Sequence, residues 1–144
     1  MEKSLKIKKI FYEKDIADLK HFFENVCGQS VNTFSYFLKR ELSVIKHHIA
    51  TNLVFDDLTP IAYSHLDRED NKIWFGICVG QEYVGRKIGS FLLDHTIQQA
   101  IENKCERIDL SVYKDNLPAI NLYKKFGFMV YNQNRDSFFM KRIL

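Results

Sequence analysis

The chain has 144 residues, of which 46% are hydrophobic, 14% aromatic and 27% charged, as in an ordinary single globular domain. Its formal net charge of +3 is spread along the chain, which is too weak for a nucleic-acid-binding surface but would mildly attract an anionic ligand. No apolar run approaches the ~20 residues of a membrane span and the three cysteines lack disulfide-framework or zinc-site spacing, so we expect a cytoplasmic protein with no membrane partner and no metal.

The first fifty residues are predicted to form one strand and two helices. Residues 5–12 favour a strand, and apolar residues then recur at helical spacing from Ile16 to Val26, where Cys27-Gly28 closes the helix. A second helix is predicted from about Thr33. Its apolar face would contain Phe34, Phe37, Leu38, Leu42, Ile45 and Ile49.

From Thr51 onward the pattern changes to short strands joined by polar turns, which favours an antiparallel meander. The predicted elements are strands over 51–57, 61–67 and 72–79, a helix over 91–101, a strand over 107–113, a short helix from Asn116, and a hairpin over 128–143. The turns are expected at 57–60, 67–71 and 132–136. The fold class is therefore α/β (α+β), with a mixed, mostly antiparallel sheet of six or seven strands and about four helices.

The segment GQEYVGRKIGS, residues 80–90, joins a predicted strand to a predicted helix. A glycine-containing loop of this kind can direct backbone N–H groups at an anion, and the helix N-terminus adds roughly half a positive charge. Gly80 and Gly85 have the spacing of a nucleotide-triphosphate loop, but Arg86 and Lys87 replace its phosphate-binding lysine and its magnesium-binding Ser or Thr. A glycine-containing turn with a solvated basic pair remains the alternative.

Two segments together resemble motifs of the GNAT-type N-acetyltransferases. VGQEYVGRKIGSFLL, residues 79–93, resembles the acyl-CoA pyrophosphate loop of that family. Gln81 replaces its usual proline, Val84 its usual arginine or glutamine, and Lys87 its central glycine. NLPAINLYKKFGF, residues 116–128, is similar to a later motif, which it matches at Asn116, Ala119, Tyr123, Lys125, Gly127 and Phe128. The resemblance implies a GNAT-like fold in one domain, 1–144, with acceptor-side helices in 1–50 and an acyl-CoA-binding core in 51–144.

The resemblance also implies acetyl-CoA as the cosubstrate and assigns residues to it. Backbone groups of Ile77, Cys78 and Val79 would hold the pantetheine arm. The pyrophosphate would lie against Val84, Gly85, Arg86, Lys87, Ile88, Gly89 and Ser90. Asn116 would contact the pantetheine amide, and it is also a good helix N-cap because Pro118 follows in the first turn. A lysine at a left-handed position would cost roughly 1 kcal/mol, whereas in helical geometry Lys87 would contact phosphate directly.

Tyr123 matches the family's general acid, which donates a proton to the CoA sulfur, although an aromatic covering the core is the alternative. A phenol with an ordinary pKa of ~10 is protonated at neutral pH. The strand KIWFGICV contains no carboxylate to serve as general base, so His65, with an ordinary pKa of ~6.5, is the leading candidate. A structural histidine is the alternative for His65. Weaker base candidates are Asp67, Asp109 and Tyr113.

The predicted activity is transfer of an acetyl group to a primary amine by direct attack in a ternary complex. The acceptor would be a small molecule, and an amino sugar or sugar nucleotide is one class that aromatic and cationic residues in the first fifty positions would suit: Phe34, Tyr36, Phe37, Arg40, His47 and His48. The alternatives are a protein or peptide N-acetyltransferase and a non-catalytic acyl-CoA sensor or structural subunit. An exposed strand edge at the C-terminal hairpin is compatible with a homodimer.

Overall fold

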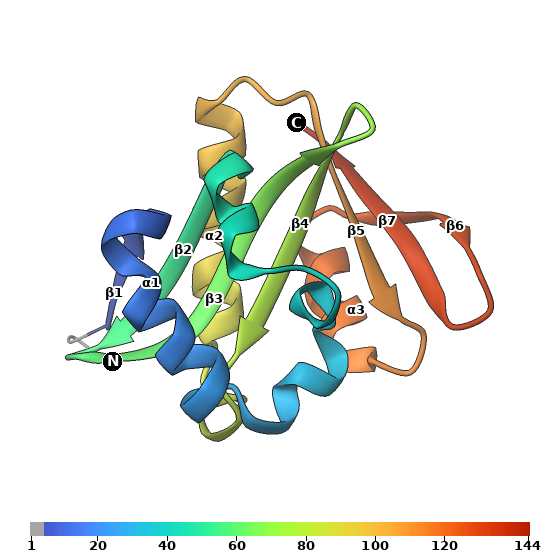
Figure 1. The fold of residues 1–144 in the computed structure, drawn as a ribbon. Coiled ribbons are helices and arrows are strands. Elements are labelled where there is room, and N and C mark those ends of the chain that lie inside the picture. Colours follow the sequence, from blue (N-terminus) through green and yellow to red (C-terminus); the bar gives the residue numbers. More distant parts are fainter. Residues whose placement is uncertain (1–4) are drawn as a thin grey trace.

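A computed structural model describes residues 5–144, which form a seven-stranded sheet with helices on both faces (Figure 1). The strands are β1 (Leu5–Lys9), β2 (Ala50–Asp56), β3 (Thr59–Glu69), β4 (Lys72–Val79), β5 (Arg107–Tyr113), β6 (Met129–Gln133) and β7 (Ser137–Ile143). They lie in the order β1-β2-β3-β4-β5-β7-β6, and neighbouring strands are antiparallel except for β4 and β5. The predicted mixed, mostly antiparallel sheet is confirmed. The first four residues of the predicted domain lie outside the described part.

The helices divide between the two faces of the sheet. Helix α1 (Tyr12–His21), continued by the π-turn η1 (Phe22–Val26), covers one face, and α2 (Ile88–Glu102) and α3 (Leu117–Lys125) cover the other (Figure 1). Side chains alternate along β3 accordingly: Tyr63 packs with the core under α1, whereas Ala62 and Leu66 pack with the core under α2. Each face therefore has its own apolar core.

The second helix predicted from about Thr33 is wrong. The chain instead forms short 3₁₀ turns, η2 (Gly28–Thr33), η3 (Tyr36–Leu38) and η4 (Leu42–His47), with extended backbone at Phe34 and Glu41. The apolar spacing belongs to a ring cluster rather than to a helix face, because Phe34 and Phe37 both pack against Tyr63 of β3. Leu38, which the prediction placed on the apolar face, is 70% exposed.

Several boundaries also differ from the prediction. The first strand ends at Lys9, and Tyr12 begins α1 instead of ending the strand. The two turns that flank β3 are short, so residues 59–60 and 67–69 belong to the strand itself. Asp70 and Asn71 both have positive φ, 55° and 64°, which suits the right-handed twist of a tight hairpin. The predicted C-terminal hairpin is confirmed as β6 and β7.

Candidate active site

The central feature of the site is the separation of β4 from β5. These parallel strands are paired at a single position, Trp74 opposite Asp109, and then diverge (Figure 1). Asp109 is fully buried there and accepts hydrogen bonds from Arg107 at 2.6 and 2.8 Å and from the hydroxyl of Tyr131. Burial acts to raise the pKa of Asp109, but these hydrogen bonds outweigh it and leave the pKa lowered. Asp109 is therefore committed to closing the sheet and does not line the cavity.

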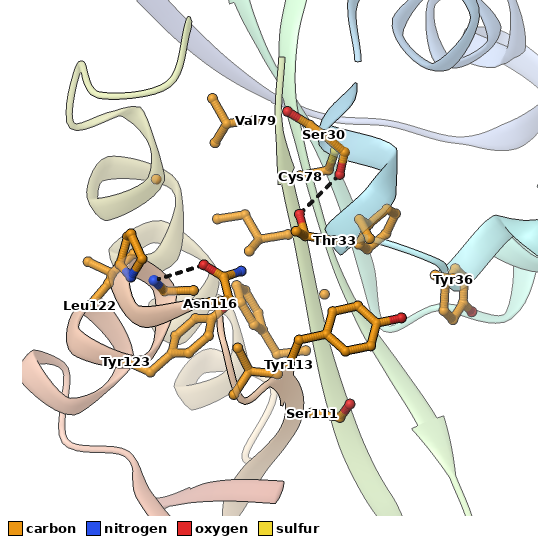
Figure 2. Close-up of a pocket in the computed structure, with 18 of the residues that line it drawn as sticks. Ser30, Thr33, Tyr36, Cys78, Val79, Ser111, Tyr113, Asn116, Leu122 and Tyr123 are labelled. Atoms are coloured by element: carbon orange, nitrogen blue, oxygen red, sulfur yellow. Dashed lines mark hydrogen bonds between the residues drawn. The ribbon is translucent and has the colours of Figure 1, made fainter. Parts of the chain in front are cut away.

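A cavity of about 690 Å³ occupies the opening between the diverging strands. On one side it is lined by β4, by the loop before α2, by the first turn of α2, and by α3; on the other side by residues 30–40 and His65. Figure 2 shows Asn116 and Tyr123 on the α3 side and Thr33 and Tyr36 on the opposite side. The cavity thus brings together residues that are more than eighty positions apart in the sequence.

Eleven of the twelve predicted cosubstrate-binding residues line this cavity: Ile77, Cys78, Val79, Val84, Gly85, Lys87, Ile88, Gly89, Ser90, Asn116 and Tyr123. The twelfth, Arg86, does not line it, and its guanidinium lies 5.2 Å from the centre of the Tyr83 ring. Within residues 5–144, β4 has no ladder partner on its β5 side past Trp74, so backbone groups along that edge are available to a ligand.

The loop before α2 contains two residues in the left-handed region. It begins with the turn η5 (Gln81–Tyr83), and Gly85 and Lys87 follow with φ of 81° and 63°. Lys87 is the N-cap of α2 and makes no side-chain cap hydrogen bond. The position where the resemblance expects a glycine therefore has glycine-like geometry while carrying a lysine. The first N–H groups of α2 have no intrahelical partner and no side-chain cap, which suits them to an anion.

Helix α3 is fixed at both ends by local hydrogen bonds. The Asn116 side chain accepts from the Ala119 N–H at 3.4 Å, and Pro118 lies in the first turn, so the predicted N-cap is confirmed. Gly127, with φ of 89°, ends the helix: its N–H donates to the Lys124 carbonyl, and that of the next residue donates to the Tyr123 carbonyl, both at 3.0 Å. These caps set the position of the Tyr123 side chain.

Tyr123 is 6% exposed and lines the cavity from α3. Its ring packs edge-on against Phe75 of β4, with 6.2 Å between the ring centres. Among residues 5–144 no hydrogen bond engages its hydroxyl. Burial raises the pKa of Tyr123, so the phenol stays protonated over the working pH range. The hydroxyl is a proton donor without an internal acceptor.

His65 lines the cavity from β3 and is 2% exposed. The Tyr63 hydroxyl lies 2.8 Å from His65 Nδ1. Cε1 and Nε2 of the His65 ring lie against Gly76, where an added β-carbon would fall 2.5 Å from Cε1 and 2.7 Å from Nε2. Burial lowers the pKa of His65 well below its ordinary value, so the imidazole is neutral. His65 and Tyr123 therefore reach the same cavity from different elements.

A hydrogen-bonded group that the sequence did not reveal holds residues 30–40 over β3. The Tyr36 hydroxyl donates to Asp67 at 2.8 Å, so its oxygen accepts from His48 Nε2, also at 2.8 Å. Burial lowers the pKa of His48 to about 4, which keeps that ring neutral and leaves Nδ1 to accept from Thr51 Oγ1 at 2.8 Å. The centres of the Tyr36 and His65 rings are 4.2 Å apart. Asp67 thus anchors the segment and is not a free base.

Within the described residues no helix is long and apolar enough to cross a bilayer. No group of three or more His, Cys, Asp or Glu side chains in residues 5–144 is arranged to hold a metal ion.

Comparison with known proteins places this arrangement in a family. The sequence profile of the Acetyltransferase (GNAT) family matches residues 17–128. The L-amino acid N-acetyltransferase AaaT of Escherichia coli (strain K12) is 33% identical over 81 residues, which are 48% of this chain and 49% of that protein. The spermine/spermidine N(1)-acetyltransferase of Bacillus subtilis (strain 168) is 36% identical over 64 residues, 43% of this chain and 42% of that protein. The matched part spans about half the length of each relative or less.

The same fold occurs in solved structures. The PaiA N-acetyltransferase from Thermoplasma acidophilum, in complex with coenzyme A, has a TM-score of 0.77 over 98% of this chain and 99% of that one, at 21% identity. A likeness at this level of identity concerns the fold.

Proposed function

Because this chain belongs to the GNAT acetyltransferase family, we propose that it transfers an acetyl group from acetyl-CoA to a primary amine by direct attack in a ternary complex. One observation carries the proposal. The cavity where β4 and β5 diverge collects an uncapped helix N-terminus, an unpaired strand edge and the unengaged hydroxyl of Tyr123. These are a phosphate site, an amide-binding edge and a proton donor.

The acyl-CoA side of the cavity would bind the cosubstrate mainly through backbone groups. N–H groups of Ile88, Gly89 and Ser90 lie in the first turn of α2, where the helix dipole favours a phosphate. The β4 edge from Ile77 to Val79 would pair with the amides of the pantetheine arm, and Asn116 would add a side-chain contact from α3. The side chains of β4 can then remain apolar and serve the core.

Catalysis would place the acceptor nitrogen against the thioester carbonyl carbon. A carbon–nitrogen bond forms, the carbon–sulfur bond breaks, and Tyr123 would donate its proton to the departing sulfur. The attacking amine loses a proton, which we assign to neutral His65, directly or through water. Tyr123 suits the acid role because burial keeps it protonated. Burial keeps His65 neutral and so able to accept a proton, while its lowered pKa makes it a weaker base than a free imidazole. The two groups would be reset by exchange with solvent through the open cavity.

The acceptor would enter beside residues 30–40. This side presents one cation and one anion, Arg40 and Glu69, and the aromatic ring of Tyr36. A small amine suits an opening of this size, and the two curated relatives are named for amino acids and for spermine and spermidine. An amino sugar or sugar nucleotide remains a further proposed acceptor class. We also propose a cytoplasmic location and a homodimer formed through the exposed edge of β6.

The test is acetylation of an amine panel, read by the mass of the product. Purified protein and acetyl-CoA are incubated with amino acids, polyamines, amino sugars, sugar nucleotides and short peptides. Acetylation of one small-molecule class supports the proposal. Turnover restricted to peptides would replace it with a protein N-acetyltransferase. Acetyl-CoA binding by calorimetry without turnover of any amine would indicate an acyl-CoA sensor or structural subunit.

A further inference from the structure

Two buried cysteines meet beside the cavity. The Sγ atoms of Cys27 and Cys78 are 3.1 Å apart, although the residues are 51 positions apart in the sequence. Cys27 is fully buried at the end of η1, whereas Cys78 is 4% exposed and lines the cavity. Figure 2 shows Cys78 beside Ser30 and Thr33 at the cavity wall. A small reagent in the cavity therefore meets Cys78 first, with Cys27 directly behind it.

The pair lies at the junction of the two sides of the site. The Cys27 carbonyl accepts from the Gln81 N–H at 3.2 Å, and the Gln81 side chain in turn accepts from the Gln29 N–H at 2.7 Å. Gly80 is packed so closely on Val26 that an added β-carbon would fall 2.9 Å from its side chain. A change at the two sulfurs would therefore reach the end of β4 and the start of the loop before α2.

We propose that Cys27 and Cys78 are a reversible oxidation site, at which a hydroperoxide closes a disulfide that slows acetyl transfer. The Cys78 thiol is oxidised to a sulfenic acid as the peroxide O–O bond breaks and one water leaves. The Cys27 thiol then attacks that sulfur, forming the S–S bond and releasing a second water. Overall, two thiols and one hydrogen peroxide give one disulfide and two waters, and a dithiol such as dithiothreitol reverses the step.

Access, not acidity, selects Cys78 for the first step, because Cys78 borders the cavity whereas Cys27, the more acidic thiol, is fully buried behind it. The hydrogen bond from Cys78 lowers the pKa of Cys27, while that bond and burial raise the pKa of Cys78, so the proton leaves Cys27 more readily. Cys27 is thus the attacking thiol of the second step. A disulfide has an S–S length of about 2.05 Å, so the two sulfurs must approach by about 1 Å. Cys78 lies on β4, so the disulfide would form on the strand whose backbone is proposed to hold the pantetheine arm.

The experiment has two independent readouts. Reduced protein is treated with hydrogen peroxide, its free thiols are blocked during denaturation, and an unreduced digest is analysed by mass spectrometry. We expect a linked peptide pair containing Cys27 and Cys78, lighter by two hydrogen atoms than the sum of the two peptides. Acetyl transfer, which rests on the proposed function, should fall at least about tenfold in the same sample and recover with dithiothreitol.

Variants separate this link from general oxidation damage. Cys27→Ala, with Cys27→Ser as a second form if the first does not fold, should yield no linked pair and keep its own untreated rate after peroxide. Cys105→Ala is the matched control, because Cys105 has no cysteine partner, and it should respond as the wild type does.

Absence of the linked pair in wild-type protein overturns the proposal, and so does a linked protein with an undiminished rate. If the reduced protein acetylates no amine while the linked pair forms, the proposed function fails and the oxidation site stands.

Discussion

The two sides of the cavity are held in place by different kinds of interaction. The acyl-CoA side consists of regular elements, β4, α2 and α3, and the caps of α3 at Asn116 and Gly127 are local in sequence. The acceptor side consists of short 3₁₀ turns over residues 28–47. It is fixed by rings and side-chain hydrogen bonds, chiefly those of Phe34 and Tyr36 with β3.

This difference determines which substitutions each side of the cavity can tolerate while still binding its ligand. A ligand bound by backbone groups depends on the path of the main chain, and side chains there can change if that path is kept. A ligand bound beside short turns depends on the side chains that position those turns. We therefore expect substitutions on the acceptor side to alter amine specificity while the sheet and cosubstrate binding persist.

The largest effect is expected from removing one oxygen on the acyl-CoA side. Tyr123→Phe keeps the ring packing on Phe75 and removes the proton donor, so kcat should fall by about 10²- to 10³-fold. Affinity for acetyl-CoA, measured by calorimetry, should stay within about threefold of the wild type, since the backbone contacts remain. Tyr83→Phe is the control, because Tyr83 also lines the cavity and its hydroxyl has no proposed part in proton transfer. An equal loss in both variants would rule out Tyr123 as the specific acid.

The next test compares Gly76, the β4 residue that packs against His65 and Phe34 of the acceptor side, with Gly89, which packs within the acyl-CoA side. Gly76→Ala would drive a β-carbon to 2.5 Å from the His65 ring, which Tyr63 and Tyr36 hold in place, so we expect about 2–3 kcal/mol of lost unfolding free energy. Acetyl transfer should fall at least about tenfold because His65 moves. Denaturant titration and steady-state kinetics measure the two effects.

Gly89→Ala is the matched substitution on the acyl-CoA side. Its added β-carbon would lie 3.6 Å from Leu122, an ordinary contact, so stability should change by less than about 1 kcal/mol. The methyl group would still border the cavity where phosphate is expected, so acetyl-CoA affinity should fall. Equal destabilisation by Gly76→Ala and Gly89→Ala would contradict the expectation that only Gly76 is too closely packed for a β-carbon.

The same contrast explains which features the sequence could predict. Asn116 before Pro118 is a cap signal that lies within a few residues of the helix start it specifies, and the predicted N-cap is confirmed. Gly127, which ends the same helix, is an equally local signal. The succession of strands and helices from residue 51 onward and the C-terminal hairpin also follow from local patterns of alternation and turns. The backbone geometry of Lys87 could not be predicted, because lysine gives no signal of positive φ.

The acceptor side was predicted poorly because its structure depends on distant contacts. Helical spacing of apolar residues is also produced by successive short turns, and the choice was decided by packing against Tyr63. The hydrogen bond from Tyr36 to Asp67 spans 31 positions and has no local signal. On the acyl-CoA side, Arg86 is the one residue predicted beside phosphate that does not line the cavity, and its guanidinium lies 5.2 Å from the centre of the Tyr83 ring.

Acidification should weaken the acceptor side first. Because burial lowers the pKa of folded His48 to about 4 from an unfolded value of ~6.5, the unfolded state binds more protons between these pH values. Stability is therefore complete above about pH 6.5 and is lost as pH falls toward 4. We expect a loss of about 2 kcal/mol, reduced from the full linkage value because His48 is partly exposed. Buried His65 adds to the same trend.

Denaturant titrations at several pH values measure this slope, and His48→Gln is the comparison. Glutamine retains a donor for Tyr36 but cannot be protonated, so the variant should lose stability less steeply below pH 6.5. Amide exchange at pH 5 should rise sooner in residues 28–47 than in α3. An unchanged slope in the variant would assign the acid sensitivity to other groups, such as His65.

The smallest effect is expected at the α2 N-cap, where one residue serves both stability and binding. Lys87→Gly relieves a left-handed lysine, with φ of 63°, and should raise the unfolding free energy by about 0.5–1 kcal/mol. Gly85→Ala is the opposite test of stability. The φ of Gly85 is 81° and no described atom lies within 4 Å of an added β-carbon, so any loss of stability reports backbone strain alone.

Lys87→Gly also tests phosphate binding. If the Lys87 side chain attracts phosphate, Lys87→Gly should bind acetyl-CoA a few-fold more weakly, with a shallower salt dependence. A more stable variant with unchanged binding would mean that Lys87 contributes only its backbone, as Cys78 and Val79 are proposed to do on β4.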